Sequence, residues 1–475
     1  MSGRIILVNK HLLTLSTCLT IQDRISRASE VFFPSDERYF QGIHHHTWSS
    51  SALSVCSVEP GISADVAIIM QLIRERRVPF GIKGGGHATN PNFSSTTGIH
   101  IAMRRLNSIT FDSQEQTVRL GAGLVWREVY KFLEPYNVTV NGGREGTAGV
   151  AGVTLGGGYG WKTNQYGLTM DSVIEYELVT PSGTIVHVNK NSYPDIFFGL
   201  KGGYNNFGIV TNFKMYVVPQ REIYGGILTY SIDNSTKFDR FINAAVNFQK
   251  NNQDARAQIE LVFYIESGVL TIRLLAIYDG PIAPEHIYKE FVDIDHIGNL
   301  NTRRMMEFWS RSFSDNIRGR YHSVLSKELS THLLKTIANQ IMDYYTELAS
   351  KHDGDISILV LLQSSKHLEH SVEGAFNPRI SSNGTFPICI ISKWNLTSDD
   401  SIFMNATQSI ADTLLKTMIE DGQFNNATEQ IIYPNFALET TPISLIYGKN
   451  LPRLQNIRKT WDPENVMYLT GGWKI

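Results

Sequence analysis

The chain of 475 residues contains only 3 cysteines, Cys18, Cys56 and Cys389. None belongs to a Cys-x-x-Cys pair, which excludes zinc ribbons and thioredoxin-like redox sites. No apolar run reaches the roughly 18 residues that a membrane-spanning helix requires, so no transmembrane segment is expected. Neither sign of charge is in excess, since 43 Lys and Arg residues stand against 45 Asp and Glu residues. Nucleic acid and anionic membranes are therefore not expected as main partners.

The N-terminus makes a poor signal peptide, because Asn9, Lys10 and His11 interrupt its apolar residues. Sequons for N-glycosylation nevertheless begin at Asn92, Asn137, Asn234, Asn383, Asn395, Asn405 and Asn426. We expect a glycoprotein that is secreted or passes through the secretory pathway, with the cytoplasm as the alternative.

Glycine is concentrated in three segments of the first half of the chain. Residues 63–77 show apolar spacing typical of a helix, with Ser63 as its expected cap. The expected strand "VPFGIK" then leads into Gly84, Gly85 and Gly86, followed by His87. "GGREGTAGVAGVTLGGGYGW" (residues 142–161) and "LKGGYNNFGIVTNF" are the other two segments, and "SVIEYELVTPSGTIVHVN" between them predicts a β-hairpin.

From Arg221 onward the pattern changes to strands separated by helices, which indicates a mainly antiparallel sheet. Residues 329–352 have the spacing of one long amphipathic helix. We therefore expect an α+β fold in which residues 1–220 (core about 50–220) and 429–475 form one domain and residues 221–428 an inserted one.

The glycine segments do not have the patterns of the common nucleotide-binding loops. None reads G-x-G-x-x-G between a strand and a helix, and none reads G-x-x-x-x-G-K-[ST]. They are either tight turns that need a positive φ, or backbone that lies close to a polyphosphate. Three such segments beside strands, one of them ending in His87, favour the second interpretation.

These segments resemble a known family. "KGGGHATNPNFSSTTGIHIAMRRLNSI", "LGGGYGWKTNQYGLTMDSV" and "LKGGYNNFGIVTNF" are similar to the FAD loops of berberine bridge enzyme-like flavoproteins. This family belongs to the vanillyl-alcohol oxidase superfamily, whose FAD-binding domain is of the p-cresol methylhydroxylase type. The tail "YPNFALETTPISLIYGKNLPRLQNIRKTWDPENVMYLTGGWKI" is similar to the family's C-terminal segment. The resemblance is dense at both ends and thin between Arg221 and Glu429.

The resemblance implies FAD, with the amides of residues 84–86 along its pyrophosphate and His87 bonded to the flavin's 8α-methyl group. The alternative for His87 is a loop histidine that hydrogen-bonds phosphate. The full set of cofactor residues implied in this way is Lys83, Gly84, Gly85, Gly86, His87, Ala88, Thr147, Gly149, Gly152, Gly156, Gly157, Tyr159, Tyr166, Ile209, Val210 and Asn435.

The chain departs from the family at two positions near the expected flavin. Many relatives carry a second covalent link from a cysteine, and here Arg144, Glu145 and Gly146 occupy that stretch, so a single link is expected. Val153 stands where many relatives have a histidine. By resemblance Cys18 and Cys56 form a disulfide, the alternative being two buried thiols, and Cys389 is expected to be a buried core thiol.

The resemblance also implies an FAD-linked oxidoreductase that moves a hydride from a small organic substrate to flavin N5, with oxygen as the expected acceptor. Tyr433 is the first candidate for the catalytic base, against an alternative as packing between domains, and Gln363 is a second residue expected to face the flavin. An oxidative cyclase, a carbohydrate oxidase and a flavin-binding protein with little turnover remain alternatives. A monomer is expected.

Three consecutive histidines, residues 44–46, do not predict a metal site. Neighbours in an extended segment point to opposite faces, so they cannot all reach one ion. We expect a surface loop there and no metal.

Overall fold

The computed structural model describes residues 2–305, 317–349, 351–364, 369–377 and 384–475. The sequon at Asn383 lies outside these residues. Within the described residues, no helix is both long and apolar enough to span a membrane.

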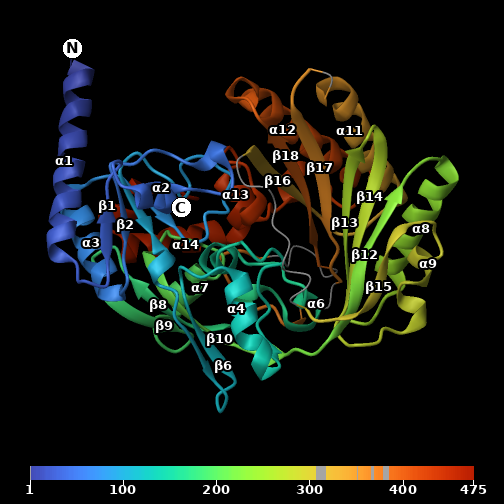
Figure 1. The fold of residues 1–475 in the computed structure, drawn as a ribbon, viewed down its shortest axis with the longest axis horizontal. Helices are drawn as coiled ribbons and strands as arrows, with labels where there is room; N and C mark the ends of the chain where they lie inside the picture. The colour runs from blue at the N-terminus through green and yellow to red at the C-terminus, as the bar shows by residue number, and fades with distance from the viewer. Residues whose placement is uncertain (1, 306–316, 350, 365–368, 378–383) are drawn as a thin grey trace.

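The first sheet contains the strand that leads into the first glycines (Figure 1). Its strand order is β1 (Glu30–Phe32), β2 (Cys56–Glu59), β4 (Ile99–Ala102) and β3 (Phe80–Lys83), with β2, β4 and β3 parallel. The expected helix is α3 (Ser63–Arg76), which ends at Arg77 in the left-handed region. Ser63 is not its cap: the helix begins at Ser63, so Ile62 is the N-cap residue, and the Ser63 hydroxyl donates to Glu177.

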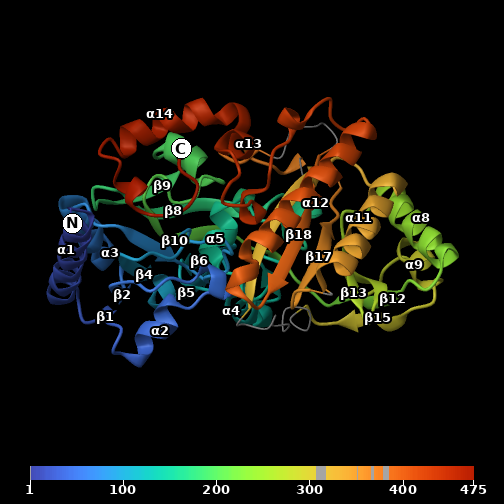
Figure 2. The same cartoon turned by 90° about the horizontal axis from the view of Figure 1, so that it is seen from above.

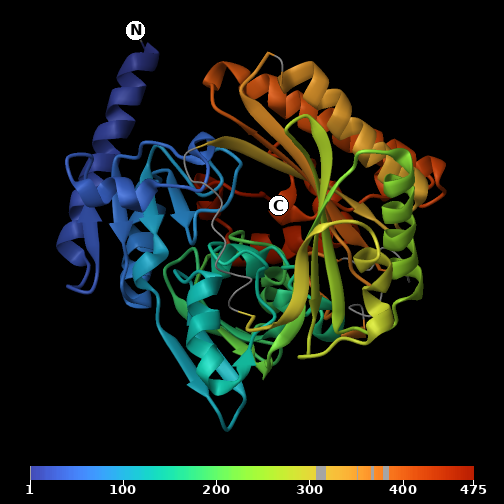
Figure 3. The same ribbon diagram turned by 45° about the vertical axis from the view of Figure 1, so that its right-hand side comes forward.

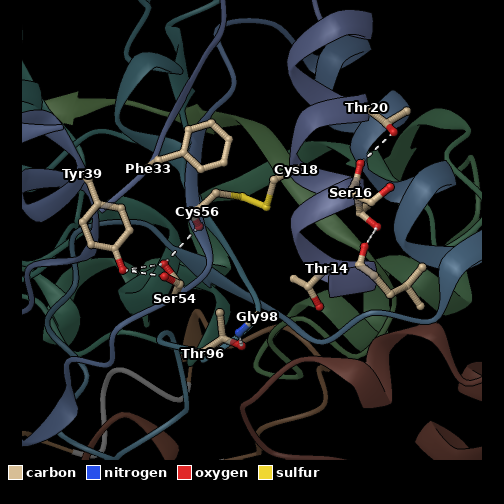
Figure 4. The surroundings of a disulfide bond; sticks show 12 residues. Thr14, Ser16, Cys18, Thr20, Phe33, Tyr39, Ser54, Cys56, Thr96 and Gly98 are labelled. Atoms are coloured by element: carbon tan, nitrogen blue, oxygen red, sulfur yellow. Dashed lines mark hydrogen bonds between the residues drawn. A yellow bond between two sulfur atoms is a disulfide. The ribbon is translucent and has the colours of Figure 1, made fainter. Parts of the chain in front are cut away.

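A disulfide joins α1 (Ser2–Arg24) to this sheet (Figure 4). Cys18 on α1 is bonded to Cys56, the first residue of β2. Both cysteines are fully buried, and α1 also packs on α3. Tyr39 on α2 (Glu37–Ile43) donates to the carbonyl of Ser54 beside them, at 2.7 Å. The implied pairing of Cys18 with Cys56 is thus present in the structure.

A second sheet is antiparallel. Its order is β5 (Ile109–Asp112), β6 (Thr117–Gly121), β10 (Ile209–Tyr216), β8 (Val173–Val179) and β9 (Ile185–Asn189). The third glycine segment runs into β10, and the segment 142–161 lies in the connection between β6 and β8. β8 and β9 are the expected hairpin. The helices α4 (Trp126–Leu133), α5 (Val150–Leu155), α6 (Thr163–Tyr166) and α7 (Pro194–Leu200) connect these strands, and β7 (Val138–Thr139) pairs with β11 (Val218–Pro219).

The second half forms a seven-stranded sheet in which every pair is antiparallel, as expected. Its order is β15 (Ile297–Arg303), β12 (Ile223–Ser231), β14 (Val269–Tyr278), β13 (Ala257–Glu266), β17 (Gly354–Leu361), β18 (Phe386–Trp394) and β16 (Arg318–Ser326). The helices α8 (Ser235–Asn251), α9 (Lys289–Val292), α11 (Thr331–Tyr344) and α12 (Asp400–Glu420) lie on its outer side (Figure 3). The helix expected over 329–352 is shorter, because it widens into a π-helix from Tyr345 to Ala349.

The C-terminal segment returns to the first half (Figure 2). Its helices α13 (Ile443–Tyr447) and α14 (Leu451–Trp461) run along that half, and α14 packs on α7. A bridge joins Thr470 to Phe80, the first residue of β3. One buried hydrophobic cluster fills the first half together with the C-terminal segment. A second one lies between the seven-stranded sheet and the helices on its outer side. The architecture is α+β, as the sequence predicts.

Candidate active site

A cavity of about 740 Å³ lies between the glycine segments, the inner face of the seven-stranded sheet and the C-terminal segment. Its volume falls in the range of roughly 300–1,000 Å³ that is typical of ligand sites. The expected residues that line it are Gly84, Gly85, Gly86, His87, Ala88, Gly149, Gly152, Tyr159, Ile209, Val210, Tyr433 and Asn435.

The glycines at this cavity allow close backbone contact, a positive φ or an open cavity wall. A Cβ at Gly85 would lie 2.4 Å from the amide nitrogen of Gly149, so the first two glycine segments touch through backbone that admits no side chain. Gly86 has a φ of 72°, which favours glycine. A Cβ at Gly152 would meet nothing within 4 Å and would stand in the cavity. This bare backbone suits a flat, extended ligand such as a dinucleotide.

His87 is held on two sides at the edge of the cavity. Its Nε2 lies 3.3 Å from the hydroxyl of Thr147, and its ring stacks on His46 with 4.1 Å between centroids. Burial, with a smaller effect from His46, lowers the pKa of His87 to about 3, so the imidazole is neutral. The surface loop expected at residues 44–46 is wrong: His45 is buried, and His46 packs on His87.

Glu145 and Thr147 form the wall behind His87. Both the backbone N–H and the hydroxyl of Thr147 donate to Glu145 Oε1, at 3.2 Å and 3.0 Å. Burial raises the pKa of Glu145. The loop after His87 is tied down as well, since Arg320 donates to the carbonyl of Thr89 and Asn90 to that of Ala437.

Tyr433 presents a buried phenol to the cavity. Its oxygen accepts hydrogen bonds from the N–H of Gly158, at 3.2 Å, and from Nδ2 of Asn435, at 2.7 Å. Burial raises the pKa of Tyr433 to about 12, and the bond from Asn435 opposes that shift. Tyr204 donates to Asn435 Oδ1 at 2.5 Å, so the amide of Asn435 is oriented by its neighbours.

Arg144 and Glu260 form a buried ion pair in the wall of the cavity, with Nη1 and Oε2 3.1 Å apart. Arg144 also donates to Gln258 and lies 4.2 Å from the ring centroid of Trp161. Its Nε is buried and has no hydrogen-bond partner among the described residues. In the sequence, Arg144 is notable only because it stands where many relatives carry a cysteine. Its partners Gln258 and Glu260 lie 114 and 116 positions further along the chain, so the sequence does not indicate the ion pair.

The sheet face turned toward the cavity combines apolar with polar side chains. Val262 on β13 is paired with Leu359 on β17, which is in turn paired with Cys389 on β18. Cys389 is buried, as expected. Leu275 and Ile391 extend this surface, and Arg273 and Lys393 add positive charge to it.

Six predicted residues are absent from the lining of this cavity: Lys83, Thr147, Gly156, Gly157, Tyr166 and Gln363. Lys83 points away and donates to the carbonyl of His44, and Thr147 lies behind His87. Gly156 and Gly157 pack under Asn435 and Tyr433, while Tyr166 lies toward Asp279. Gln363 is buried and accepts from Gln258 at 3.3 Å, and Gln258 in turn accepts from Arg144 of the cavity wall.

Comparison with known proteins agrees with this arrangement. Residues 55–189 match the family described as "FAD binding domain". Residues 433–471 match the family described as "Berberine and berberine like". The two matches cover the glycine segments around His87 and Glu145 and the tail that carries Tyr433.

Full-length relatives and solved structures extend the likeness over the whole chain. The FAD-dependent monooxygenase drtC of Aspergillus calidoustus is 27% identical, over 97% of this chain and 90% of the relative. An uncharacterized FAD-linked oxidoreductase of Arthroderma benhamiae is 29% identical, over 95% and 93% of the two chains. Among solved structures, the glucooligosaccharide oxidase of Acremonium strictum has a TM-score of 0.80 at 18% identity, covering 97% of this chain and 98% of that one. The Physcomitrella patens protein BBE-like 1 has a TM-score of 0.77 at 20% identity, covering 95% and 97%. The chain is therefore an FAD-binding enzyme, an FAD-linked oxidoreductase similar to the berberine bridge enzyme-like family in its FAD-binding domain and its C-terminal segment.

Proposed function

We propose that this protein oxidises a small, largely apolar organic molecule, which binds between FAD and the seven-stranded sheet. Residues 1–220 and 429–475 would hold the cofactor, and residues 221–428 the substrate. The observation that carries the proposal is the single cavity bordered by His87, the bare glycine backbone and the phenol of Tyr433. Bound FAD would accept a hydride from a substrate carbon and pass the electrons to molecular oxygen.

His87 is the proposed site of covalent FAD attachment. It is neutral, half-buried and held beside the glycine backbone, which suits a nitrogen that must bond carbon. The solved glucooligosaccharide oxidase is described as carrying a 6-S-cysteinyl, 8α-N1-histidyl FAD. In this chain Cys18 and Cys56 are bonded to each other, and the corresponding stretch at Arg144 to Gly146 has no sulfur. We infer one covalent link, through His87.

Tyr433 is the proposed base that takes a proton from the substrate's hydroxyl or amine. Two donors, Gly158 and Asn435, point at its oxygen and stabilise the negative charge of a phenolate. The hydroxyl proton is left to point toward a bound molecule. Gln363 remains a weaker candidate because it does not line the cavity.

The sheet face favours an apolar substrate over an oligosaccharide. A sugar brings many hydroxyl groups that each need a hydrogen-bond partner when they leave water. Val262, Leu275, Leu359 and Ile391 offer none through their side chains, so the hydroxyl groups of a sugar would depend on the polar side chains of the same sheet: Glu260, Arg273, Tyr321, Ser357 and Lys393. Oxidative ring closure on such a substrate, oligosaccharide oxidation and binding without turnover are the alternatives to simple oxidation.

An anaerobic substrate panel tests the proposal. Apolar phenols and benzylic alcohols should bleach the flavin absorbance, whereas glucose oligomers should not. Bleaching by oligomers alone would contradict the apolar assignment, and bleaching by nothing would favour the binding protein. With a substrate in hand, peroxide yield and incorporation of labelled oxygen separate oxidase from monooxygenase, and product analysis reveals ring closure.

We infer that the protein is a monomer that passes through the secretory pathway and is glycosylated. The Cys18–Cys56 disulfide fits an oxidising compartment. The described sequon asparagines are all exposed: Asn92, Asn137, Asn234, Asn395, Asn405 and Asn426. A change in gel mobility after endoglycosidase treatment of protein made in a eukaryotic host, with the mass in solution, tests this inference.

A further inference from the structure

Glu145, Thr147 and His87 are linked in a chain of hydrogen bonds that substrate oxidation does not require. Thr147 lies between the other two, 3.0 Å from Glu145 Oε1 and 3.3 Å from His87 Nε2. These hydrogen bonds run from the imidazole through Thr147 to Glu145, which itself lines the cavity.

The direction of each hydrogen bond follows from counting protons. The backbone N–H of Thr147 donates to Glu145 Oε1, so this oxygen acts as an acceptor. The hydroxyl of Thr147 gives its one proton to the same oxygen. Thr147 Oγ1 can then only accept from His87, which places a proton on Nε2 of the ring. Because the ring is neutral and Nε2 carries the proton, the lone pair lies on Nδ1.

The ring cannot easily turn to exchange its two nitrogens. The ring of His46 stacks on one face of the His87 ring with an interplanar angle of 13°. The backbone N–H of His46 donates to the carbonyl of Gly86, at 2.9 Å. The residue that holds the ring is thus itself tied to the glycine before His87.

We propose that Glu145 and Thr147 are positioning residues for covalent flavin attachment: they fix the Nε2–H tautomer of His87 and receive that proton as Nδ1 forms its bond. This rests on the proposed function, in which His87 carries the flavin. A bond forms between Nδ1 and the methyl carbon of the flavin while one C–H bond of that methyl group breaks. The Nε2 proton passes to Thr147 as the hydroxyl proton of Thr147 passes to Glu145. The two electrons left on the flavin pass to oxygen, which with the two released protons gives hydrogen peroxide.

The rate of attachment tests this proposal. The full chain is produced under riboflavin limitation, mixed with FAD, and sampled for acid-stable flavin over time. Thr147→Val removes the hydroxyl at nearly constant volume, and Glu145→Gln keeps an oxygen acceptor but cannot take the proton. Both should slow attachment on the order of a hundredfold, as expected for a lost proton acceptor. Thr147→Ser keeps the hydroxyl and should attach FAD at close to the wild-type rate.

Two further measurements separate positioning from structural damage. Quenching of FAD fluorescence before attachment should give the same affinity in all variants. Nitrogen-15 shifts of labelled histidine, assigned with His87→Ala, should show a protonated Nε2 in the wild type and a mixture of tautomers in Thr147→Val. Equal attachment rates in wild type, Thr147→Val and Glu145→Gln would overturn the proposal. A wild-type chain with no acid-stable flavin would overturn covalent attachment itself, and this proposal with it.

Discussion

Arg144 on the second glycine segment reaches Glu260 on β13, with 3.1 Å between Nη1 and Oε2. The exposed fractions of the two side chains are 9% and 13%, so the pair joins the two halves of the protein out of reach of most water. Removing one partner leaves the other charge buried, which typically costs about 3–5 kcal/mol.

We therefore expect Glu260→Leu alone to lower the free energy of unfolding by about 3–5 kcal/mol, and Arg144→Met with Glu260→Leu to recover most of it. Urea denaturation of the three proteins measures this. Arg119→Met serves as a control. The Arg119 side chain is 44% exposed, so its ion pair with Glu175 contributes at most about 1 kcal/mol. Equal losses of unfolding free energy in Glu260→Leu and Arg119→Met would show that the buried ion pair contributes no more to stability than the exposed one.

The flavin should stay with the polypeptide after acid precipitation. The reason is the proposed bond from the neutral, half-buried His87. His87→Ala should release yellow colour into the supernatant while the folded protein still binds FAD through the glycine backbone. Absorbance of pellet and supernatant gives the answer, and wild-type colour in the supernatant would disprove the bond.

Peptide mapping should find flavin only on the peptide that contains His87. Cys18 and Cys56 are bonded to each other, and Cys389 is buried on β18 with its thiol pKa raised by burial. Mass spectrometry after proteolysis measures the linkage. Flavin on a cysteine peptide would show that the stretch around Glu145 has been aligned wrongly with the family.

Tyr433→Phe should slow flavin reduction by about a hundred- to ten-thousand-fold, the usual contribution of positioned proton transfer. The ring keeps its contacts with Tyr159 and Phe436, so folding and FAD retention should change little. Rapid anaerobic mixing with substrate measures the rate. A variant reduced as fast as the wild type would leave Tyr433 as packing between the two halves.

The reductive rate should rise with pH throughout the range in which the protein is stable. The pKa of Tyr433 is about 12, so the phenolate fraction is small at neutral pH and grows by about tenfold per pH unit below that value. Lys393, whose pKa is lowered by burial, also titrates in the cavity. Tyr433→Phe is the control, because it should remove the slope that belongs to the phenol. A flat wild-type profile would restrict Tyr433 to orienting the substrate.

Local patterns were enough for the elements that depend on neighbouring residues. Alternation and a turn predicted the β8–β9 hairpin, and apolar spacing predicted α3 up to Arg77. The α+β fold and the FAD-binding family were confirmed as well. The placement of His87 beside bare glycine backbone followed from its position after a strand.

Contacts between distant segments could not be predicted from the same patterns. Nothing near His46 shows that its ring stacks on His87, and nothing near Arg144 points to Glu260. Gln363 and Tyr166 were assigned by resemblance alone, and neither lines the cavity, since Gln363 bonds to Gln258 and Tyr166 lies near Asp279. Side-chain direction at the ends of strands and short helices depends on tertiary packing, which a single sequence does not reveal.

The return of the C-terminal segment determines the order in which the site can be assembled. Residues 433–437 and 472–473 supply one wall of the cavity, while its glycine backbone is made several hundred residues earlier. During synthesis the glycine backbone is made before residues 433–437 and 472–473. An FAD molecule that binds at that stage would therefore contact an open surface rather than a cavity. Loading of the cofactor is therefore an event of the finished chain, and a product that stops before Tyr433 would lack the phenol and the wall together.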